Sequence, residues 1–175
     1  TEPVTISKVW IAKAEGDSRI DPDTCVPLTF SGSASVTIPA GERIKSDPVQ
    51  FSFQKGTHIA VSLWLKDFTE MRSSVRISGP LSGGFFALGN QTTLAQLDAN
   101  TSKKTNLYYF LSDIEVLTGE QQRAIICYGD SITAGAWPDE LMRRTLKIGD
   151  GTTAIVRKAV CGTRILRQYD NITYD

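Results

Sequence analysis

The residues best suited to chemistry lie in one short turn, Gly129-Asp130-Ser131-Ile132-Thr133-Ala134-Gly135. An apolar run at residues 124–128 precedes this turn, and helix signals follow it. A turn from a strand into a helix is a place where a serine can be exposed as a nucleophile. Backbone N–H groups at the start of the helix then face the developing oxyanion. Thr133 occupies the position of the second glycine in the G-x-S-x-G elbow, so spacing alone equally explains Ser131 as a helix N-cap.

A nucleophilic serine needs a general base, and the sequence holds a single histidine, His58. His58 lies far before Ser131 in the chain, at the start of a β-rich run, where we expect a structural role. His58 is therefore not expected to be the base that activates Ser131.

Three cysteines, Cys25, Cys127 and Cys161, are widely spaced and form no C-x-x-C pair. This wide spacing lacks the paired ligands typical of a zinc site, and we expect neither a metal nor another cofactor. We interpret them as unpaired buried thiols, which favours a reducing, cytoplasmic compartment. A Cys127–Cys161 disulfide, and secretion after removal of a leader, stay open as alternatives.

The elements before residue 119 are predicted to be strands. Period-two alternation of apolar residues, which is typical of strands, occurs at residues 36–38, 49–53 and 59–65. Residues 4–14 and 108–117 are two further β-rich runs. Loops rich in Gly, Pro, Ser and Asp join these runs, and the whole pattern indicates an antiparallel sandwich.

After Gly119 the pattern changes to strand, helix, strand. Apolar residues at 124–128 and 154–160 predict two strands of a parallel sheet. One such unit does not cover both faces of a parallel sheet. The pattern therefore predicts the opening part of a larger α/β domain.

Pro138 predicts the start of a helix between these strands, because proline is favoured in the first turn of a helix. The pairs Asp139–Arg143 and Glu140–Arg144 have the i, i+4 spacing of ion pairs on a helix surface. Both pairs therefore predict a solvated helix face.

Composition excludes several classes of function. The 175 residues include 19 basic and 19 acidic side chains, which balance to a net charge of zero. This balance offers no electrostatic footprint for nucleic acid or an anionic membrane surface. No apolar run approaches the roughly 18 residues of a membrane span. Nothing in the composition indicates the oligomeric state.

Two segments resemble signature blocks of the GDSL, or SGNH, hydrolase superfamily. Residues 128–133 (YGDSIT) resemble the first block, which residues 137–141 (WPDEL) continue. Residues 159–166 (AVCGTRIL) resemble the second block. The β-rich front, with its segments at 30–32, 35–41, 46–49 and 59–64, is similar to the N-terminal β-sandwich of bacterial members. The resemblance thus covers nearly the whole chain.

The resemblance implies that Ser131 is the nucleophile of ester hydrolysis. The backbone N–H groups of Ser131 and Gly162 would be oxyanion-hole donors, and Asp130 would order the turn. The family's Asn block and its late Asp-x-x-His block have no match in this sequence. We therefore expect the chain to be a truncated part of a larger enzyme, inactive or nearly so by itself.

Three further residues near these blocks have two interpretations each. Trp137 would form a wall of the substrate pocket, or would pack under the helix. Arg164 would reach the substrate, or would be a solvated charge. Cys161 departs from the family pattern, and we expect a small buried filler beside the active site rather than a catalytic thiol.

The predicted fold class is a jelly-roll-like β-sandwich at residues 1–118 followed by the first part of an SGNH hydrolase domain at residues 119–175. That domain would be a three-layer α/β structure with a flavodoxin-like parallel sheet.

The predicted function of the parent protein is hydrolysis of carboxylic esters through an acyl-Ser131 intermediate, as a bacterial esterase, lipase or acylhydrolase. Its substrates would be small-molecule or carbohydrate esters, including O-acetyl groups. The alternative is a carbohydrate-binding or interaction module without catalysis. That alternative needs an exposed aromatic platform, for which the sequence offers Trp10, Trp64 and the Phe85–Phe86 pair.

Overall fold

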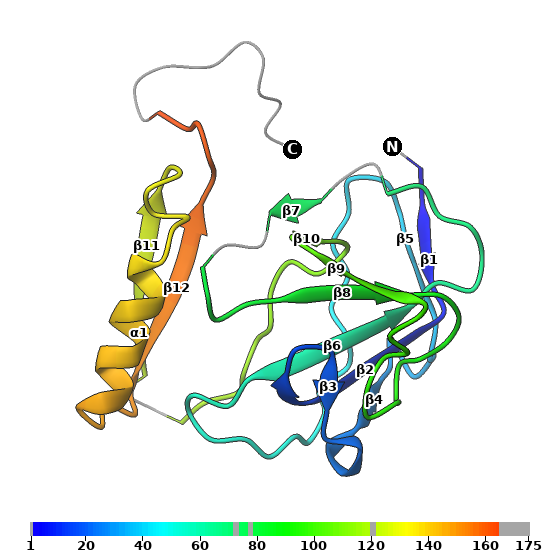
Figure 1. The fold of residues 1–175 in the computed structure, drawn as a ribbon, viewed down its shortest axis with the longest axis horizontal. Coiled ribbons are helices and arrows are strands. Elements are labelled where there is room, and N and C mark those ends of the chain that lie inside the picture. The colour runs from blue at the N-terminus through cyan, green and yellow to red at the C-terminus, as the bar shows by residue number, and fades with distance from the viewer. Residues whose placement is uncertain (1, 72–73, 77–78, 120–121, 165–175) are drawn as a thin grey trace. The chain divides into compact units, whose positions relative to one another are not determined.

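The computed structural model describes residues 2–71, 74–76, 79–119 and 122–164. Its contacts divide the chain into two units. Figure 1 labels their strands and α1, coloured along the chain. The first unit contains residues 1–74 and 84–105, and the second contains residues 75–83 and 106–175. The predicted division between residues 118 and 119 stays a prediction.

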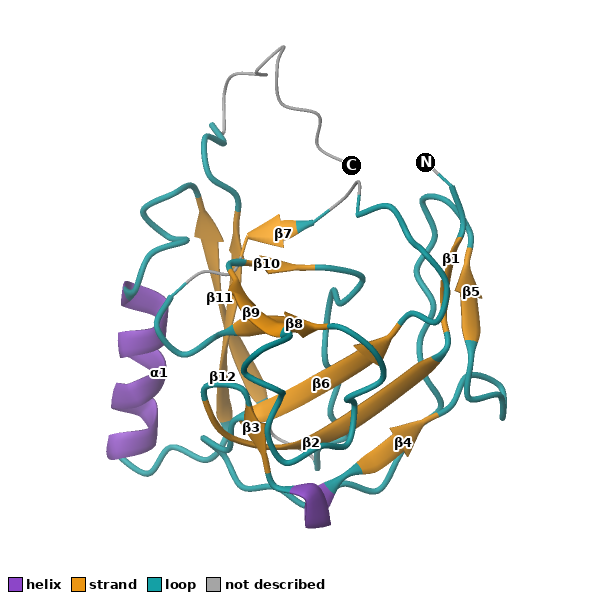
Figure 2. Cartoon of the chain, turned by 45° about the vertical axis from the view of Figure 1, so that its right-hand side comes forward, coloured by secondary structure: helices purple, strands orange, loops and turns teal. Residues whose placement is uncertain are grey.

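The first unit is built around β2 (Lys8–Gly16), which pairs with three other strands in an antiparallel manner. Figure 2 shows these partners, which are β3 (Arg19–Ile20), β4 (Val26–Leu28) and β6 (Ile59–Trp64). The short 3-10 helix η1 (Pro22–Thr24) connects β3 to β4. The alternating apolar residues of β2 and its neighbours supply the interior of this unit.

Two further antiparallel pairs complete the described strands of the first unit. One joins β1 (Val4–Ile6) to β5 (Val36–Ile38), and the other joins β8 (Gly84–Ala87) to β9 (Ser102–Thr105). The buried apolar residues of this unit come from β1, β2, β3 and β5, and they are Ile6, Val9, Ile11, Ala12, Ile20 and Val36.

The second unit contains one parallel and one antiparallel strand pair. The strands β11 (Arg123–Gly129) and β12 (Thr153–Ala159) are parallel, and the helix α1 (Trp137–Lys147) connects them and packs against β12. β7 (Val75–Arg76) pairs with β10 (Leu107–Tyr108) in an antiparallel manner. Because β11 and β12 run in the same direction in register, the turns that follow them lie at the same edge.

The predicted fold class is wrong. Strands are the main regular structure among the described residues, and α1, with 11 residues, is the one α-helix there. A three-layer α/β hydrolase domain with a flavodoxin-like sheet needs several helices, because helices cover both faces of its parallel strands. The described part of the second unit has a single parallel pair with a helix on one side only.

Individual elements agree with the sequence patterns in part. Strands are confirmed within residues 4–14, 36–38 and 59–65, as are the strand–helix–strand order after residue 122 and the helix start near Pro138. Residues 49–53 form no strand, although apolar residues alternate there. Val49 and Phe53 are exposed and only Phe51 is half-buried, and alternation alone does not make a strand, which needs a hydrogen-bonded neighbour as well.

The run at residues 108–117 is another incorrect strand prediction. Only Tyr108 of this run belongs to a strand, as the last residue of β10, and residues 109–117 pair with no strand in the described part of the chain. Among the described residues, no helix is long and apolar enough to cross a bilayer.

Candidate functional site

The turn that carries Ser131 is a compact loop between β11 and α1. The Ala134 N–H donates to the Asp130 carbonyl at 2.9 Å, and the Gly135 N–H donates to the Ile132 carbonyl at 3.1 Å. The Asp130 carboxylate accepts a hydrogen bond from the Ile132 N–H at 3.0 Å. These three bonds hold the backbone on either side of Ser131, and Asp130 contributes one of them with its side chain.

Gly129, the last residue of β11, is a position where a side chain does not fit. A Cβ atom at this residue would run into the Thr133 side chain, which folds back over it and is itself buried. The absence of a side chain therefore lets the turn close tightly against the end of the strand.

The two segments that the sequence analysis singled out meet at the Gly129 carbonyl. This oxygen accepts hydrogen bonds from the Val160 N–H at 3.0 Å and from the Thr163 hydroxyl at 3.4 Å. The Thr163 hydroxyl also bonds the Val160 carbonyl at 2.9 Å, which closes the turn after β12. Thr163 thus ties the second segment to the first, a role that the sequence analysis did not assign. Ile165 and Leu166 of the second segment lie outside the described residues.

Ser131 and Gly162 are both exposed, one in each of these two turns. Among the hydrogen bonds between described residues, none uses the N–H of Ser131 or the N–H of Gly162. Their assignment as oxyanion donors stays a prediction.

The helix face predicted to be solvated is partly buried. Glu140 does form the predicted pair with Arg144, at 3.0 Å. Asp139 does not pair with Arg143 but forms an ion pair with Arg157 of β12, with side-chain exposures of 11% and 17%. The i, i+4 rule considers only partners within the helix. In the folded chain the partner of Asp139 comes from β12 instead.

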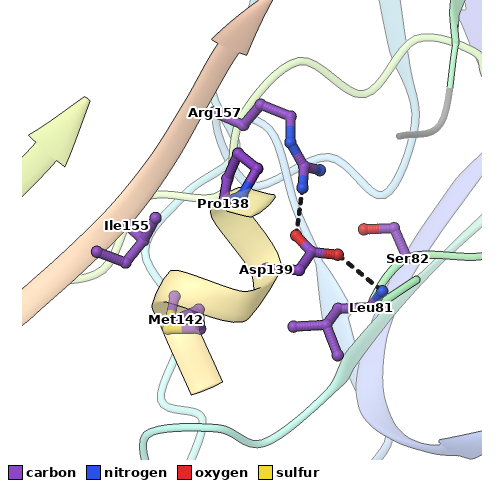
Figure 3. Close-up of a pocket in the computed structure, with 7 residues that line it drawn as sticks. All are labelled: Leu81, Ser82, Pro138, Asp139, Met142, Ile155 and Arg157. Carbon is purple, nitrogen blue, oxygen red and sulfur yellow. Dashed lines mark hydrogen bonds and ion pairs between the residues drawn. The ribbon is translucent and has the colours of Figure 1, made fainter. Parts of the chain in front are cut away.

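Figure 3 shows the surroundings of this ion pair. One oxygen of Asp139 binds the Arg157 guanidinium, and the other accepts the Leu81 N–H at 3.0 Å. Arg157 also donates to the Gly135 carbonyl at 3.2 Å. A cavity of about 230 Å³ adjoins the pair and is lined by Leu81, Ser82, Pro138, Asp139, Met142, Ile155 and Arg157.

Sequence analysis missed this pair, although a signal was present. Arg157 interrupts the apolar run of the second parallel strand, and a charged side chain in a covered strand requires a partner. Ile155 and Arg157, two residues apart, both line the cavity beside α1, so they occupy the helix-facing side of β12.

The remaining candidates near the turn are exposed. Trp137 is 46% exposed at the start of α1, so it is not an aromatic buried under the helix. Cys161 is exposed, which makes the prediction of a buried filler wrong. Arg164 lies on the surface of the turn after β12, and its role in binding substrate stays a prediction.

The thiols do not share one environment. Cys127 is buried in β11, Cys25 is half-buried and Cys161 is exposed, and none of the three forms a disulfide. Burial raises the pKa of the Cys25 thiol, and the nearby Asp21 carboxylate raises it further. His58 is exposed in the first unit, where its carbonyl accepts the Ala14 N–H at 2.9 Å. No group of three or more His, Cys, Asp or Glu side chains among the described residues is arranged to hold a metal ion.

The aromatic candidates for a carbohydrate platform are mostly half-buried. Trp64 lies opposite Lys8 on β2, whose ammonium group is 5.5 Å from the ring centroid. Trp10 and Phe85 are also half-buried, and Phe86 is 54% exposed. One exposed ring does not form a platform, so the binding-module alternative gains no specific support here.

A scan of the sequence against protein-family models finds no match, and a search of curated protein sequences finds none.

Proposed function

We propose that Ser131 is the nucleophile of carboxylic-ester hydrolysis. The observation that carries the proposal is the pairing of two turns at one edge of the parallel strands. Ser131 is exposed in the first turn, and the backbone N–H groups of Ser131 and Gly162 are unused by described residues. The resemblance of residues 128–133 and 159–166 to GDSL-type signature blocks points to the same chemistry.

In the proposed reaction, the Ser131 Oγ attacks the ester carbonyl and its proton passes to a base. The carbonyl oxygen becomes an oxyanion, which the two N–H groups would stabilise by hydrogen bonds. Collapse of the intermediate breaks the ester bond, releases the alcohol and leaves the acyl group on Ser131. Water then hydrolyses the acyl-serine to a carboxylic acid. We expect short acyl groups, including O-acetyl groups of small molecules or carbohydrates.

The base is the component for which the sequence offers no candidate, because its single histidine, His58, lies far before Ser131 in the chain and the Asp-x-x-His block has no match. A serine without a base is a weak nucleophile at neutral pH. We therefore expect the 175-residue chain to accumulate acyl-Ser131 slowly and to turn over poorly. Oxyanion stabilisation and binding without a base still accelerate acyl transfer by about 10³-fold over water.

The test is acetylation of the chain by p-nitrophenyl acetate, followed by mass spectrometry of the peptides. We expect Ser131 to be acetylated at least about 10²-fold faster than Ser112, an exposed serine of the same unit. The adduct should disappear in Ser131→Ala and persist in Ser112→Ala. Equal labelling of the two serines would contradict the proposal. Full Ser131-dependent turnover would instead support the nucleophile and overturn the prediction of a missing base.

A further inference from the structure

The Ser131 turn is held at both of its ends by β12 and the residues that follow it. At the start, the Gly129 carbonyl accepts from the Val160 N–H and the Thr163 hydroxyl. At the far end, the Gly135 carbonyl accepts from Arg157 at 3.2 Å. Ser131 lies between these two attachments. Its position relative to Gly162 therefore depends on both of them.

The attachment at Gly135 depends on a single side chain, and Asp139 orients that side chain. Asp139 lies in the first turn of α1, and its carboxylate binds the same guanidinium nitrogen of Arg157 that bonds Gly135. The other carboxylate oxygen accepts the Leu81 N–H. A Cβ atom at Gly79 would meet this carboxylate and Arg157. The chain around residues 79–81 thus encloses the pair.

A gain in stability does not by itself explain such a pair. Removing two charges from water is costly, and apolar residues of similar volume often stabilise a protein equally well. One guanidinium nitrogen carries two N–H donors in a fixed plane, which lets it bond a carboxylate and a backbone carbonyl together. Lysine would keep the charge but not this planar arrangement.

We propose that Arg157 and Asp139 are positioning residues for Ser131, acting through the Gly135 carbonyl. The inference rests on the proposed function of Ser131. Asp139 fixes the guanidinium, the guanidinium fixes the end of the turn, and the turn presents Ser131 toward the N–H groups that face the oxyanion. A displacement of about 1 Å in such a site reduces the rate by up to about 10²-fold.

The test compares Arg157→Lys and the double variant Asp139→Leu/Arg157→Met with the wild-type chain. The double variant leaves no unpaired buried charge, so we expect it to fold, and Arg157→Lys provides a milder change. Both should acetylate Ser131 at least about 10-fold more slowly, at temperatures well below their unfolding transitions. The matched control is Lys158→Met, which breaks the exposed Lys158–Asp113 pair one residue further along β12.

A second measurement does not depend on ester chemistry. Hydrogen exchange of the Ala134 and Gly135 amides, both hydrogen-bonded within the turn, should be about 10-fold faster in the Arg157 variants and unchanged in Lys158→Met. Wild-type rates of acetylation and exchange in both variants would overturn the inference. If wild-type Ser131 reacts no faster than Ser112, the proposed function fails, and amide exchange alone decides whether Arg157 and Asp139 order the turn.

Discussion

The interiors of the two units contain different kinds of side chain. In the first unit, the buried residues of β1, β2, β3 and β5 are almost all aliphatic, and Thr92 is the buried polar residue among those described. In the second unit, the buried residues include four polar ones, Thr133, Asp139, Thr145 and Thr153. The first unit therefore gains most from apolar burial, whereas the interior of the second also holds the Asp139–Arg157 ion pair and the hydrogen-bonded hydroxyls of Thr145 and Thr153.

The apolar residues of β11, in the second unit, are less buried than those of β2, in the first. β11 is an apolar run, yet Ile126 is 63% exposed and Tyr128 is 76% exposed. Both alternate with Cys127, which is buried beside the helix-facing residues of β12. Similar apolar sequences thus end up buried in β2 and exposed in β11, because burial depends on which elements cover each face of a sheet.

The largest effect is expected from Asp139→Ala. This substitution leaves the Arg157 guanidinium buried beside a missing carboxylate, which should lower the free energy of unfolding by about 3–5 kcal/mol. The matched control is Glu140→Ala in the same helix turn, where the ion pair is exposed and contributes about 0–1 kcal/mol. Urea denaturation measures both. If Asp139→Ala lowers the free energy of unfolding no more than Glu140→Ala does, the buried ion pair of the second unit adds little stability.

Ile11→Ala tests the apolar side of the comparison. Ile11 is 8% exposed, and its truncation should cost about 2–5 kcal/mol through lost burial and a residual cavity. The counterpart in the second unit is Ile126→Ala, for which we expect a change within about 0.5 kcal/mol. If Ile126→Ala lowers the free energy of unfolding as much as Ile11→Ala in the same experiment, the expected difference between the two strands is contradicted.

Gly129→Ala tests how tightly the Ser131 turn packs against β11. The new methyl group would collide with Thr133, and such overpacking costs about 1–3 kcal/mol. Adding Thr133→Ala should restore part of the loss, and a double-mutant cycle measures this coupling. Strictly additive losses in the cycle would mean that the two side chains do not meet.

The smallest effect on stability is expected from two carboxylates, Asp150 and Asp47. Each accepts hydrogen bonds from groups of a nearby loop, one in each unit. Asp150 accepts from the Thr152 N–H and hydroxyl and from the Thr153 N–H. Hydrogen bonds from the Thr153 and then the Thr152 groups hold the pKa of Asp150 far below its ordinary value of 3.8. In the first unit, hydrogen bonds from Thr29 and Gly32 lower the pKa of Asp47.

Because these carboxylates have lower pKa values in the folded state, their contribution to stability is present above the unfolded value of 3.8. It is lost as the pH falls through 3.8 toward the folded-state pKa. We expect Asp150→Asn and Asp47→Asn to lower Tm slightly at pH 7, with each difference from the wild type shrinking below about pH 4. A difference that grows on acidification would contradict the sign of both shifts.

Local sequence patterns predicted the secondary-structure elements of the candidate site. The apolar run before Gly129, the small residues around Ser131 and Pro138 at the start of a helix are short-range signals, and the structure has a strand, a turn and a helix at these positions. The bonds that assemble the site were not predictable in this way. Arg157 follows Asp139 by 18 positions, and Thr163 follows Gly129 by 34.

By itself, the sequence determined the strands within residues 4–14, 36–38 and 59–65 and the order of strand, turn and helix around Ser131. These properties depend on steric and hydrogen-bonding preferences over a few residues. Only the tertiary structure decided that residues 49–53 form no strand, that Asp139 pairs with Arg157, and that Ile126 and Tyr128 stay exposed. Each of these outcomes depends on which distant element lies alongside, because ladder bonds, ion pairs and burial all need a partner in space.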